Sequence, residues 1–306
     1  MRYFARILSH MSNITPKEGE MLHLQTYTDP HEWYTRVEAF LLEREAEHNL
    51  IFGLSHIVRH QPDIYPDFYL AVVTDDTGRI VGAALRTAPH NLILSHFTSP
   101  DAVRLLAESI EPLVKLLPGV TGAPAEIDAF VPVWHQLTRQ PYEVEMPQKI
   151  YALRTVIPAR PTAGMLRDAT PDDIDLLTVW HVGFVRDALH DETYNSDDSR
   201  LWAERSFEYK QRRLFIWQIG GQPVALVGVT GPTPHGIRIG PVYTPPELRG
   251  MGYASAAVAA VSQQLLDEGR EFCFLYTDAD NPTSNKIYAA IGYEYVCESV
   301  MIRFGA

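Results

Sequence analysis

The chain has little of what marks several large classes of protein. Only two of its 306 residues are cysteines, Cys273 and Cys297, and both fall in segments that we predict to be strands. Two cysteines exclude a scaffold of several disulfide bonds, and no zinc-ligand spacing is present, so we expect two buried thiols and no metal site. No apolar run reaches the roughly 18 residues of a spanning helix, so we expect no membrane partner.

Positive charge is also scarce. The sequence has 26 Lys and Arg residues against 38 Asp and Glu residues, a formal net charge of -12. Nucleic acids are bound by basic surfaces, so we expect no nucleic-acid partner, whereas a cationic acceptor such as an amine is compatible with an acidic protein. Residues 1–8 lack the long apolar segment of a signal peptide, which favours a cytoplasmic location. Residues 1–20 show no clear pattern, so Met21 is an alternative start to Met1, and no feature indicates the oligomeric state.

Length and composition predict a globular protein with two domains. Hydrophobic residues make up 46% of the chain and charged residues 21%, and 306 residues are enough for two hydrophobic cores. Between residues 156 and 164, Pro158, Pro161 and Gly164 interrupt the apolar periodicity, which is typical of a domain boundary. We therefore predict one domain at residues 1–157 and a second at residues 164–306.

The second half carries local signals for alternating helices and strands. Thr170 followed by Pro171 and two aspartates predicts the start of a helix that continues to Leu189. Gly220-Gly221 predicts a hairpin turn between two strands. The other predicted elements are helices at about 198–210, 253–269 and 282–291, and strands at 214–219, 223–230, 237–243, 271–277 and 295–304.

The first half repeats this order in weaker form. It begins with a predicted helix at 38–57, followed by a predicted hairpin of strands at 68–74 and 79–87. Residues 88–94 (APHNLIL) then resemble residues 233–239 (TPHGIRI). We interpret the likeness as an internal duplication; the alternative is that two mixed α/β halves share turn chemistry by chance.

The stretch Arg249-Gly250-Met251-Gly252-Tyr253-Ala254 stands between a predicted strand and a predicted helix. A turn of this kind leaves backbone N–H groups without intrahelical partners at the positive end of the helix dipole, which suits a pyrophosphate. Gly250 and Gly252 have no Cβ, so phosphate oxygens can approach the backbone. The alternative is an ordinary strand-to-helix turn. Neither a dinucleotide-binding G-x-G-x-x-G nor the Gly-Lys-Ser/Thr of a P-loop is present.

A second motif follows in the right order. Asn281 is a suitable N-cap, Pro282 a suitable first helical residue, and Gly292 fits a left-handed position at the helix end, with Tyr288 in the second half of the helix. Together, the two motifs resemble the GNAT acetyltransferase superfamily. The resemblance is to Arg/Gln-x-x-Gly-x-Gly/Ala followed by an Asn…Tyr…Gly-aromatic helix, and it covers about residues 164–306. It implies an α/β fold of two tandem GNAT-like domains, each a mixed, mostly antiparallel sheet with flanking helices.

The resemblance also implies a function. GNAT enzymes are acyl-CoA-dependent N-acyltransferases, so we expect acetyl transfer from acetyl-CoA to a primary amine of a small molecule, by direct attack in a ternary complex. In that family the glycine turn binds pyrophosphate, the asparagine region lines the pantetheine arm, and the helix tyrosine protonates the departing thiolate. The predicted catalytic residue is Tyr288. The predicted cofactor-binding residues are Val242, Tyr243, Arg249, Gly250, Met251, Gly252, Tyr253, Ala254, Asn281 and Asn285.

Three points stay open in the sequence. Many relatives place a glutamate on the strand before the glycine turn, but residues 237–242 contain no carboxylate. The first half has no glycine in residues 98–106 and no recognisable tyrosine-bearing helix, so we predict a degenerate, non-catalytic copy. Alternative functions are a CoA-binding sensor or partner-binding protein without turnover, and an aminoacyl transferase, which the acidic balance disfavours. The candidate bases, besides ordered water, are Asp278, Asp280, His181, His190 and His235.

Overall fold

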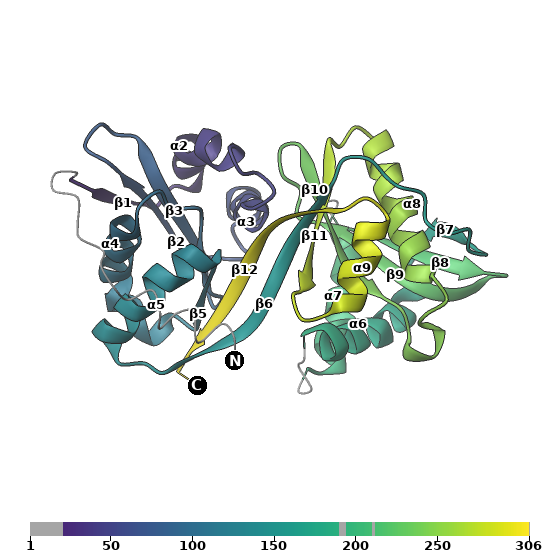
Figure 1. Ribbon diagram of the computed structural model, residues 1–306. Coiled ribbons are helices and arrows are strands. Elements are labelled where there is room, and N and C mark those ends of the chain that lie inside the picture. Colours follow the sequence, from purple (N-terminus) through teal and green to yellow (C-terminus); the bar gives the residue numbers. More distant parts are fainter. Residues whose placement is uncertain (1–20, 190–193, 210–211, 306) are drawn as a thin grey trace. The chain divides into compact units, whose positions relative to one another are not determined.

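The computed structural model describes residues 21–189, 194–209 and 212–305. The candidate base His190, the possible start at Met1 and the predicted helix end at Lys210 lie outside these ranges. The chain divides into two compact units (Figure 1). The second unit contains Glu45–Gly53 and Pro147–Glu298, and the first contains the rest. The division after Met146 falls inside a strand, so the domain limits at 157 and 164 remain a prediction from sequence.

In the first unit, helices flank a sheet with the strand order β1-β2-β3-β4-β5-β12. Neighbouring strands are antiparallel except for β4 and β5, which are parallel. The elements of the first half are β1 (His23–Tyr27), α2 (Pro30–Leu42), α3 (Asn49–His60), β2 (Phe68–Thr74), β3 (Ile80–Thr87), β4 (Leu92–Leu94), α4 (Pro100–Ile110), η1 (Glu111–Leu116), β5 (Gly119–Gly122), α5 (Pro124–Thr138) and β6 (Tyr142–Leu153).

The sheet of the second unit has the strand order β6-β11-β10-β9-β8-β7. Here β10 and β11 form the parallel pair. The elements of the second half are β7 (Met165–Asp168), η2 (Pro171–Asp173), α6 (Ile174–Leu189), α7 (Ser196–Glu208), β8 (Arg213–Ile219), β9 (Gln222–Thr230), β10 (Gly236–Tyr243), η3 (Pro246–Leu248), α8 (Tyr253–Asp267), β11 (Phe272–Asp278), α9 (Pro282–Ala290) and β12 (Glu294–Phe304).

The two halves of the chain repeat one order of elements. Leaving aside the 3₁₀ turns, β1 to β6 and β7 to β12 both run β-α-α-β-β-β-α-β-α-β. The last strand of each repeat completes the sheet of the other unit, because β6 pairs with β11 from Cys273↔Leu153 onward and β12 pairs with β5 from Val300↔Gly122 onward. The predicted fold class, two tandem α/β domains with mostly antiparallel sheets, agrees with this architecture.

One predicted element is wrong. Residues 38–57 do not form a single helix, since α2 ends at Leu42 and α3 begins at Asn49. The intervening turn contains Glu45, whose carboxylate accepts hydrogen bonds from Thr233 Oγ1 and from the backbone N–H groups of His235 and Gly236. These long-range bonds hold the segment in a turn, and tertiary contacts of this kind override local helix propensity.

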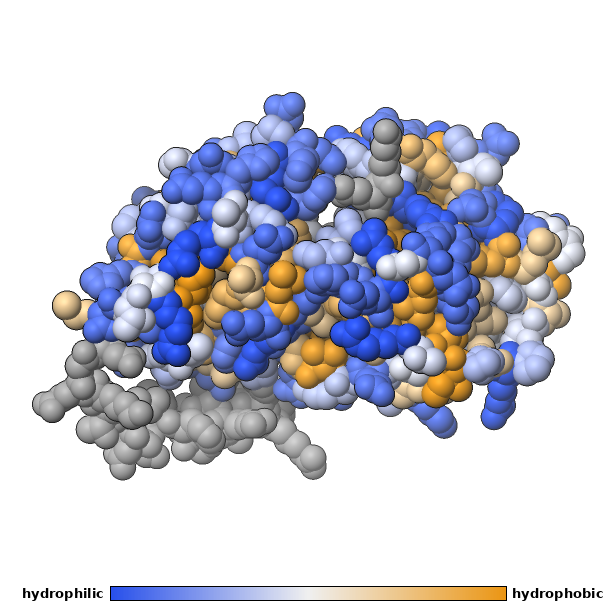
Figure 2. Space-filling model, turned by 90° about the horizontal axis from the view of Figure 1, so that it is seen from above, coloured by the Kyte–Doolittle hydropathy of each residue, from blue (hydrophilic) through white to orange (hydrophobic). Residues whose placement is uncertain are grey.

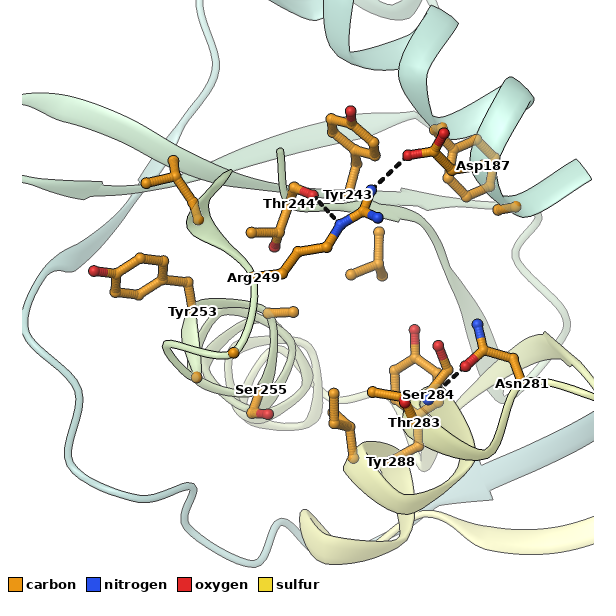
Figure 3. Close-up of a pocket in the computed structure, with 18 residues that line it drawn as sticks. Asp187, Tyr243, Thr244, Arg249, Tyr253, Ser255, Asn281, Thr283, Ser284 and Tyr288 are labelled. Carbon is orange, nitrogen blue, oxygen red and sulfur yellow. Dashed lines mark hydrogen bonds and ion pairs between the residues drawn. The ribbon is translucent and has the colours of Figure 1, made fainter. Parts of the chain in front are cut away.

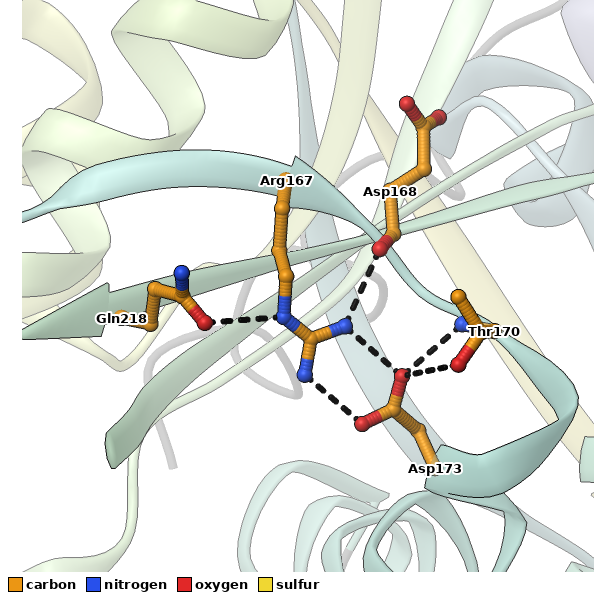
Figure 4. Close-up of polar contacts among 5 residues, drawn as sticks. All are labelled: Arg167, Asp168, Thr170, Asp173 and Gln218. Atoms are coloured by element: carbon orange, nitrogen blue, oxygen red, sulfur yellow. Dashed lines mark hydrogen bonds and ion pairs between the residues drawn. The ribbon is translucent and has the colours of Figure 1, made fainter. Parts of the chain in front are cut away.

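The start of α6 is fixed by a polar corner that the sequence predicted. Thr170 and Asp173 form a capping box, in which the Thr170 N–H donates to the Asp173 carboxylate at 2.8 Å. Arg167 on β7 donates two bonds of 2.7 Å to the same carboxylate, one to each oxygen, and a third of 2.9 Å to Gln218 (Figure 4). Because Arg–carboxylate pairs of this geometry are directional, the corner orients α6 against the sheet.

Both faces of the sheet in the second unit are covered. Val227 and Val229 of β9 pack with α8 in one core cluster, whereas Leu226 packs with α6 and α7 in another. Alternate side chains of a strand point to opposite faces, so the buried part of β9, residues 224–229, is apolar. Cys273 is fully buried and Cys297 is partly buried.

The strand β10 is irregular at its glycine and proline, Gly240-Pro241. Its register against β9 shifts between Ile239 and Val242, across Gly240-Pro241, which is a bulge. Its parallel pairs with β11 run from Gly236 to Arg238. The two strands therefore part at their carboxyl ends, where open α/β sheets bind ligands.

The surface is mainly polar on the face seen in Figure 2, where hydrophobic side chains occur in small groups among hydrophilic ones. Isolated exposed apolar residues such as Val179, at 68% exposure, are ordinary for a folded protein. In the part of the chain that the structure describes, no helix has the length and apolar character needed to cross a membrane.

Candidate active site

A cavity of about 530 Å³ lies in the second unit, where the end of β10, the first turn of α8 and one side of α9 meet (Figure 3). Nine of the predicted residues line it: Val242, Tyr243, Arg249, Gly250, Gly252, Tyr253, Ala254, Asn281 and Tyr288. The other lining residues were not predicted: Phe184, Asp187, Ala188, Thr244, Leu248, Ser255, Thr283, Ser284 and Ile287. The structure thus brings together the glycine turn and the tyrosine helix, two motifs that are separate in the sequence.

The glycine turn has a conformation that side chains resist. Gly250 and Gly252 have φ values of +80° and +85°, in the left-handed region that favours glycine. Gly252 is the N-cap of α8, so it provides no side-chain oxygen for the first N–H groups of that helix. A Cβ built at Gly250 would meet no atom within 4 Å. The turn therefore presents open backbone at a helix N-terminus, which is an arrangement that binds anions.

Arg249 is held at the edge of the cavity by two partners. Its Nε donates to the Thr244 carbonyl at 2.9 Å, and its guanidinium forms an ion pair of 2.5 Å with Asp187 of α6 (Figure 3). The hydrogen bond from Arg249 lowers the pKa of Asp187, so this carboxylate is ionised at neutral pH. Sequence reasoning missed Asp187 because the contact between α6 and the glycine turn is long-range, and no local pattern marks it.

The start of α9 is built by an asparagine cap. Asn281 Oδ1 accepts the Ser284 N–H at 3.1 Å, and Ser284 and Tyr288 follow on one face of the helix, four residues apart. This spacing was a signal that could have identified Ser284 as a lining residue.

Two predicted cofactor-binding residues do not line the cavity. Met251 is 61% exposed. The amide of Asn285 donates to the carbonyl oxygens of Asp278 and Ala279, at 3.3 and 3.4 Å, which ties the loop before α9 to the helix.

Tyr288 faces the cavity with a free hydroxyl. In the described ranges its Oη has no hydrogen-bond partner, and its ring packs edge-on against Tyr293 at 5.9 Å between centroids. Burial raises the pKa of Tyr288 to about 12. The side chain is therefore fully protonated at neutral pH and can donate a proton or a hydrogen bond to a group in the cavity.

None of the candidate bases that the structure describes lines this cavity. The carboxylate of Asp278, the last residue of β11, accepts the Asp280 N–H at 2.8 Å and so caps the turn that follows the strand. His181 bonds to Ser199 and stacks on Trp202, and burial lowers its pKa to about 4, so it is neutral in the core of α6 and α7.

The remaining histidine, His235, pairs with Glu45 at 2.7 Å. Asp187 is the one carboxylate among the residues found to line the cavity. Among the described residues, no cluster of three or more His, Cys, Asp or Glu side chains could hold a metal ion.

Comparisons with known proteins agree with this geometry. The family model described as acetyltransferase (GNAT) family matches residues 182–293, which include the glycine turn and α9. No curated protein sequence matches the chain.

Solved structures resemble nearly the whole chain. A GCN5-related N-acetyltransferase from Sphaerobacter thermophilus has a TM-score of 0.56 at 16% identity, covering 94% of this chain and 96% of that one. A tandem GNAT protein from the clavulanic acid biosynthesis pathway has a TM-score of 0.56 at 16% identity, covering 94% and 99%. A GNAT-family acetyltransferase from Colwellia psychrerythraea has a TM-score of 0.53 at 12% identity, covering 92% and 98%.

At these identities the structures establish a shared fold, and the family model matches residues 182–293 of the second half. Both agree with the repeated order of elements and with the motifs that meet in the cavity. The chain therefore contains a domain of the acetyltransferase (GNAT) family, at residues 182–293, within the fold of a tandem GNAT protein.

Proposed function

We propose that this protein is an N-acyltransferase that moves the acetyl group of acetyl-CoA to a primary amine of a small molecule. The observation that carries the proposal is the cavity in which the uncapped glycine turn of α8 faces Tyr288 of α9. One element can hold a pyrophosphate and the other can supply a proton, which are two requirements of acyl transfer from a CoA thioester.

The residues present fit such a co-substrate. Gly250 and Gly252, with the first residues of α8, offer backbone N–H groups to the phosphates. The hydroxyl of Thr244, which lines the same cavity after the end of β10, is buried and has no hydrogen-bond partner among the residues that the structure describes. A buried polar atom without a partner is costly, so a ligand group at this position would satisfy it. We propose that the segment from Val242 to Thr244 runs beside the pantetheine arm.

The chemistry divides between substrate and protein. Acetyl-CoA supplies the thioester carbonyl, which a neutral amine attacks; the C–S bond then breaks and the sulfur needs a proton. We propose that the Tyr288 hydroxyl donates this proton, since it is protonated and free of other partners among the described residues. The attacking nitrogen, which is cationic once it is bonded to the carbonyl carbon, loses its proton to water, because the ion pair with Arg249 keeps Asp187 a poor base. Solvent then returns a proton to the Tyr288 phenolate.

Cys273 is not a nucleophile in this scheme. Its side chain is fully buried in the core beside α8, and burial raises the pKa of the thiol to about 12. A thiol in that state is unreactive, which supports direct transfer without an acyl-enzyme. The acidic charge and the scarcity of apolar runs lead us to propose a cytoplasmic protein with no nucleic-acid or membrane partner.

One observation favours a second candidate function. The cavity contains no carboxylate other than the ion-paired Asp187 in its described lining. A CoA-binding sensor without turnover would need the glycine turn but no base, and it is the runner-up.

A binding and turnover experiment separates the two functions. Acetyl-CoA is titrated calorimetrically into the full chain, and free thiol is then followed with acetyl-CoA and a panel of primary amines. We expect saturable binding and thiol release with at least one amine. Binding without release for any amine would favour the sensor, and absence of binding would refute both.

A further inference from the structure

Arg238 is a cation without a partner. It is partly buried on β10, yet in the described ranges it donates no hydrogen bond and forms no ion pair. Burial lowers its pKa, but an arginine remains charged at any physiological pH. A charge that is partly withdrawn from water without a counter-ion is unfavourable, and such groups are commonly binding groups for an anion.

The position of Arg238 is where β10 and β11 part. It is the last β10 residue paired with β11, opposite Phe274. Its neighbours Ile237 and Ile239 belong to the core cluster that contains α8, so Arg238 points to the other face of the sheet. Tyr276, two residues beyond Phe274, points to that same face.

Asn49 lies beside Tyr276 and also has a hydrogen-bond acceptor that no described residue uses. It is only 1% exposed, and its Nδ2 donates to Tyr276 Oη at 3.0 Å and to the Ala46 carbonyl at 2.7 Å. Among the described residues, its Oδ1 is buried without a partner. Because Tyr276 accepts a hydrogen bond from Asn49, its own hydroxyl hydrogen is available to a further acceptor. Arg238 is the largest charge acting on this hydroxyl, ahead of Cys297 and Glu47.

We propose that Arg238, Tyr276 and Asn49 form an acceptor subsite, and that the amine acceptor of this enzyme carries a carboxylate. The guanidinium binds a carboxylate in a bidentate manner and the Tyr276 hydroxyl donates a further bond. Asn49 is a positioning residue in this subsite, because its hydrogen bond holds the Tyr276 hydroxyl in place. This inference rests on the proposed function and names the substrate class of that activity.

The position relative to the cavity is consistent with an acceptor role. Arg238 and the cavity-lining Val242 stand four residues apart on β10, on either side of the bulge at Gly240-Pro241, so at most about 13 Å of chain separates them. An acceptor anchored by its carboxylate at Arg238 can thus direct its amine along the strand toward the proposed thioester position.

The test compares acceptors with and without a carboxylate. Acetyl transfer is measured for ω-amino carboxylates from glycine to 6-aminohexanoate and for alkylamines of matched length, in the wild type, Arg238→Met and Arg238→Lys. We expect kcat/KM to favour the carboxylates by at least about tenfold in the wild type, and Arg238→Met to abolish that preference. Arg238→Lys should retain the charge and the fold but lose part of the preference.

The matched control is Arg200→Met. It removes an exposed arginine of α7 that pairs with Asp175 of α6 and Glu204 of α7, and it should leave the preference for carboxylates unchanged. Calorimetric titration of the same carboxylates without acetyl-CoA supplies a readout independent of turnover, in which Arg238→Met should lose binding.

The possible outcomes separate the two proposals. Efficient acetylation of alkylamines, with no effect of Arg238→Met on any acceptor, would overturn the subsite and leave the acetyltransferase standing. If acetyl-CoA does not bind, the proposed function fails, and the carboxylate titration still decides whether Arg238 is an anion site.

Discussion

The same turn is built in two ways in the two repeats. In the second repeat α8 begins after its N-cap Gly252, which has no side chain to cap the helix. In the first repeat the corresponding helix, α4, begins after Ser99, whose hydroxyl accepts the Asp101 N–H at 3.2 Å. Asp101 also places a negative charge in the first turn. At a capped and acidic helix N-terminus, the protein's own side chains bind the first backbone N–H groups. At an uncapped glycine turn, those N–H groups are available to an external anion.

The neighbouring helices differ in the same sense. α9 carries Tyr288 toward the cavity, while α5 contains Pro132 and no tyrosine. Near the start of α5, Glu126 is 3% exposed and its carboxylate accepts the Phe97 N–H at 2.9 Å. In the first unit, the Glu126 carboxylate therefore takes up the backbone N–H of Phe97, just beyond the end of β4, so this N–H is not available to a ligand. The comparison supports our proposal that the first repeat is a degenerate, non-catalytic copy.

Removing the hydroxyl of Tyr288 should have the largest effect. Tyr288→Phe keeps the ring against Tyr293 but removes the proton donor, so kcat should fall by about a hundredfold or more while the Kd for acetyl-CoA changes little. Steady-state kinetics on an identified amine and calorimetry would measure the two quantities. Near-normal turnover of Tyr288→Phe would contradict the proton-donor role and show that the tyrosine contributes packing alone.

A charge in the glycine turn should weaken binding of the co-substrate. Gly252→Asp places a carboxylate where phosphate is expected, and acetyl-CoA affinity should fall at least about tenfold, or about 1.4 kcal/mol, by calorimetry. Gly269→Asp is the control, because Gly269 also has a left-handed φ, of +101°, but does not line the cavity. A Cβ at Gly269 meets no atom within 4 Å, whereas one at Gly252 meets Thr162 Oγ1 at 3.3 Å. Equal affinities for acetyl-CoA in the two folded variants would contradict the assignment of the pyrophosphate to this turn.

The stoichiometry of binding tests the asymmetry of the repeats directly. If Ser99 and Glu126 close the first repeat, the full chain should bind one equivalent of acetyl-CoA rather than two. Titration of the wild type to saturation, with active concentration fixed by amino-acid analysis, gives this number. Two equivalents would show that the first repeat retains a functional site.

Two histidines at matching places in the repeats should titrate on opposite sides of the ordinary value. The hydrogen bond and charge of Glu45 raise the pKa of His235, whereas burial and then Arg86 lower the pKa of His90. The raised pKa of His235 means that its pairing stabilises the fold fully below pH 6.5 and less as pH rises through the folded pKa. Because His235 is half exposed, the stability effect should be small.

Proton-detected titration of the two imidazoles provides the measurement. Glu45→Gln should return the His235 pKa toward 6.5 and leave His90 unaffected. Identical midpoints in the wild type would contradict the pairing of His235 with Glu45.

The sequence predicted those parts of the site whose causes are local. The caps at Thr170 and Asn281 and the hairpin at Gly220-Gly221 each follow from the conformational preferences of a few adjacent residues. The roles of the predicted site residues were inferred from resemblance and remain to be tested.

The parts that could not be predicted depend on partners far away in the chain. Asp187 meets Arg249 across 62 residues, and Glu45 meets His235 across 190. The second contact breaks a predicted helix, since four donors of one loop outweigh a helical preference that is worth tenths of a kcal/mol per residue. Likewise, the sequence alone could not show that Arg238 lacks a counter-ion among the described residues, because this depends on where every acidic side chain lies in the fold.

The exchange of β6 and β12 has a consequence for the history of this gene. If the first repeat were deleted, β11 would lose β6 and present an open strand edge, which invites aggregation. The second repeat therefore depends on its ancestral twin for one strand of its sheet. A first repeat without chemistry of its own would still be retained for β6, and also for Glu45 and Asn49, which bond to Thr233 and Tyr276 of the second repeat.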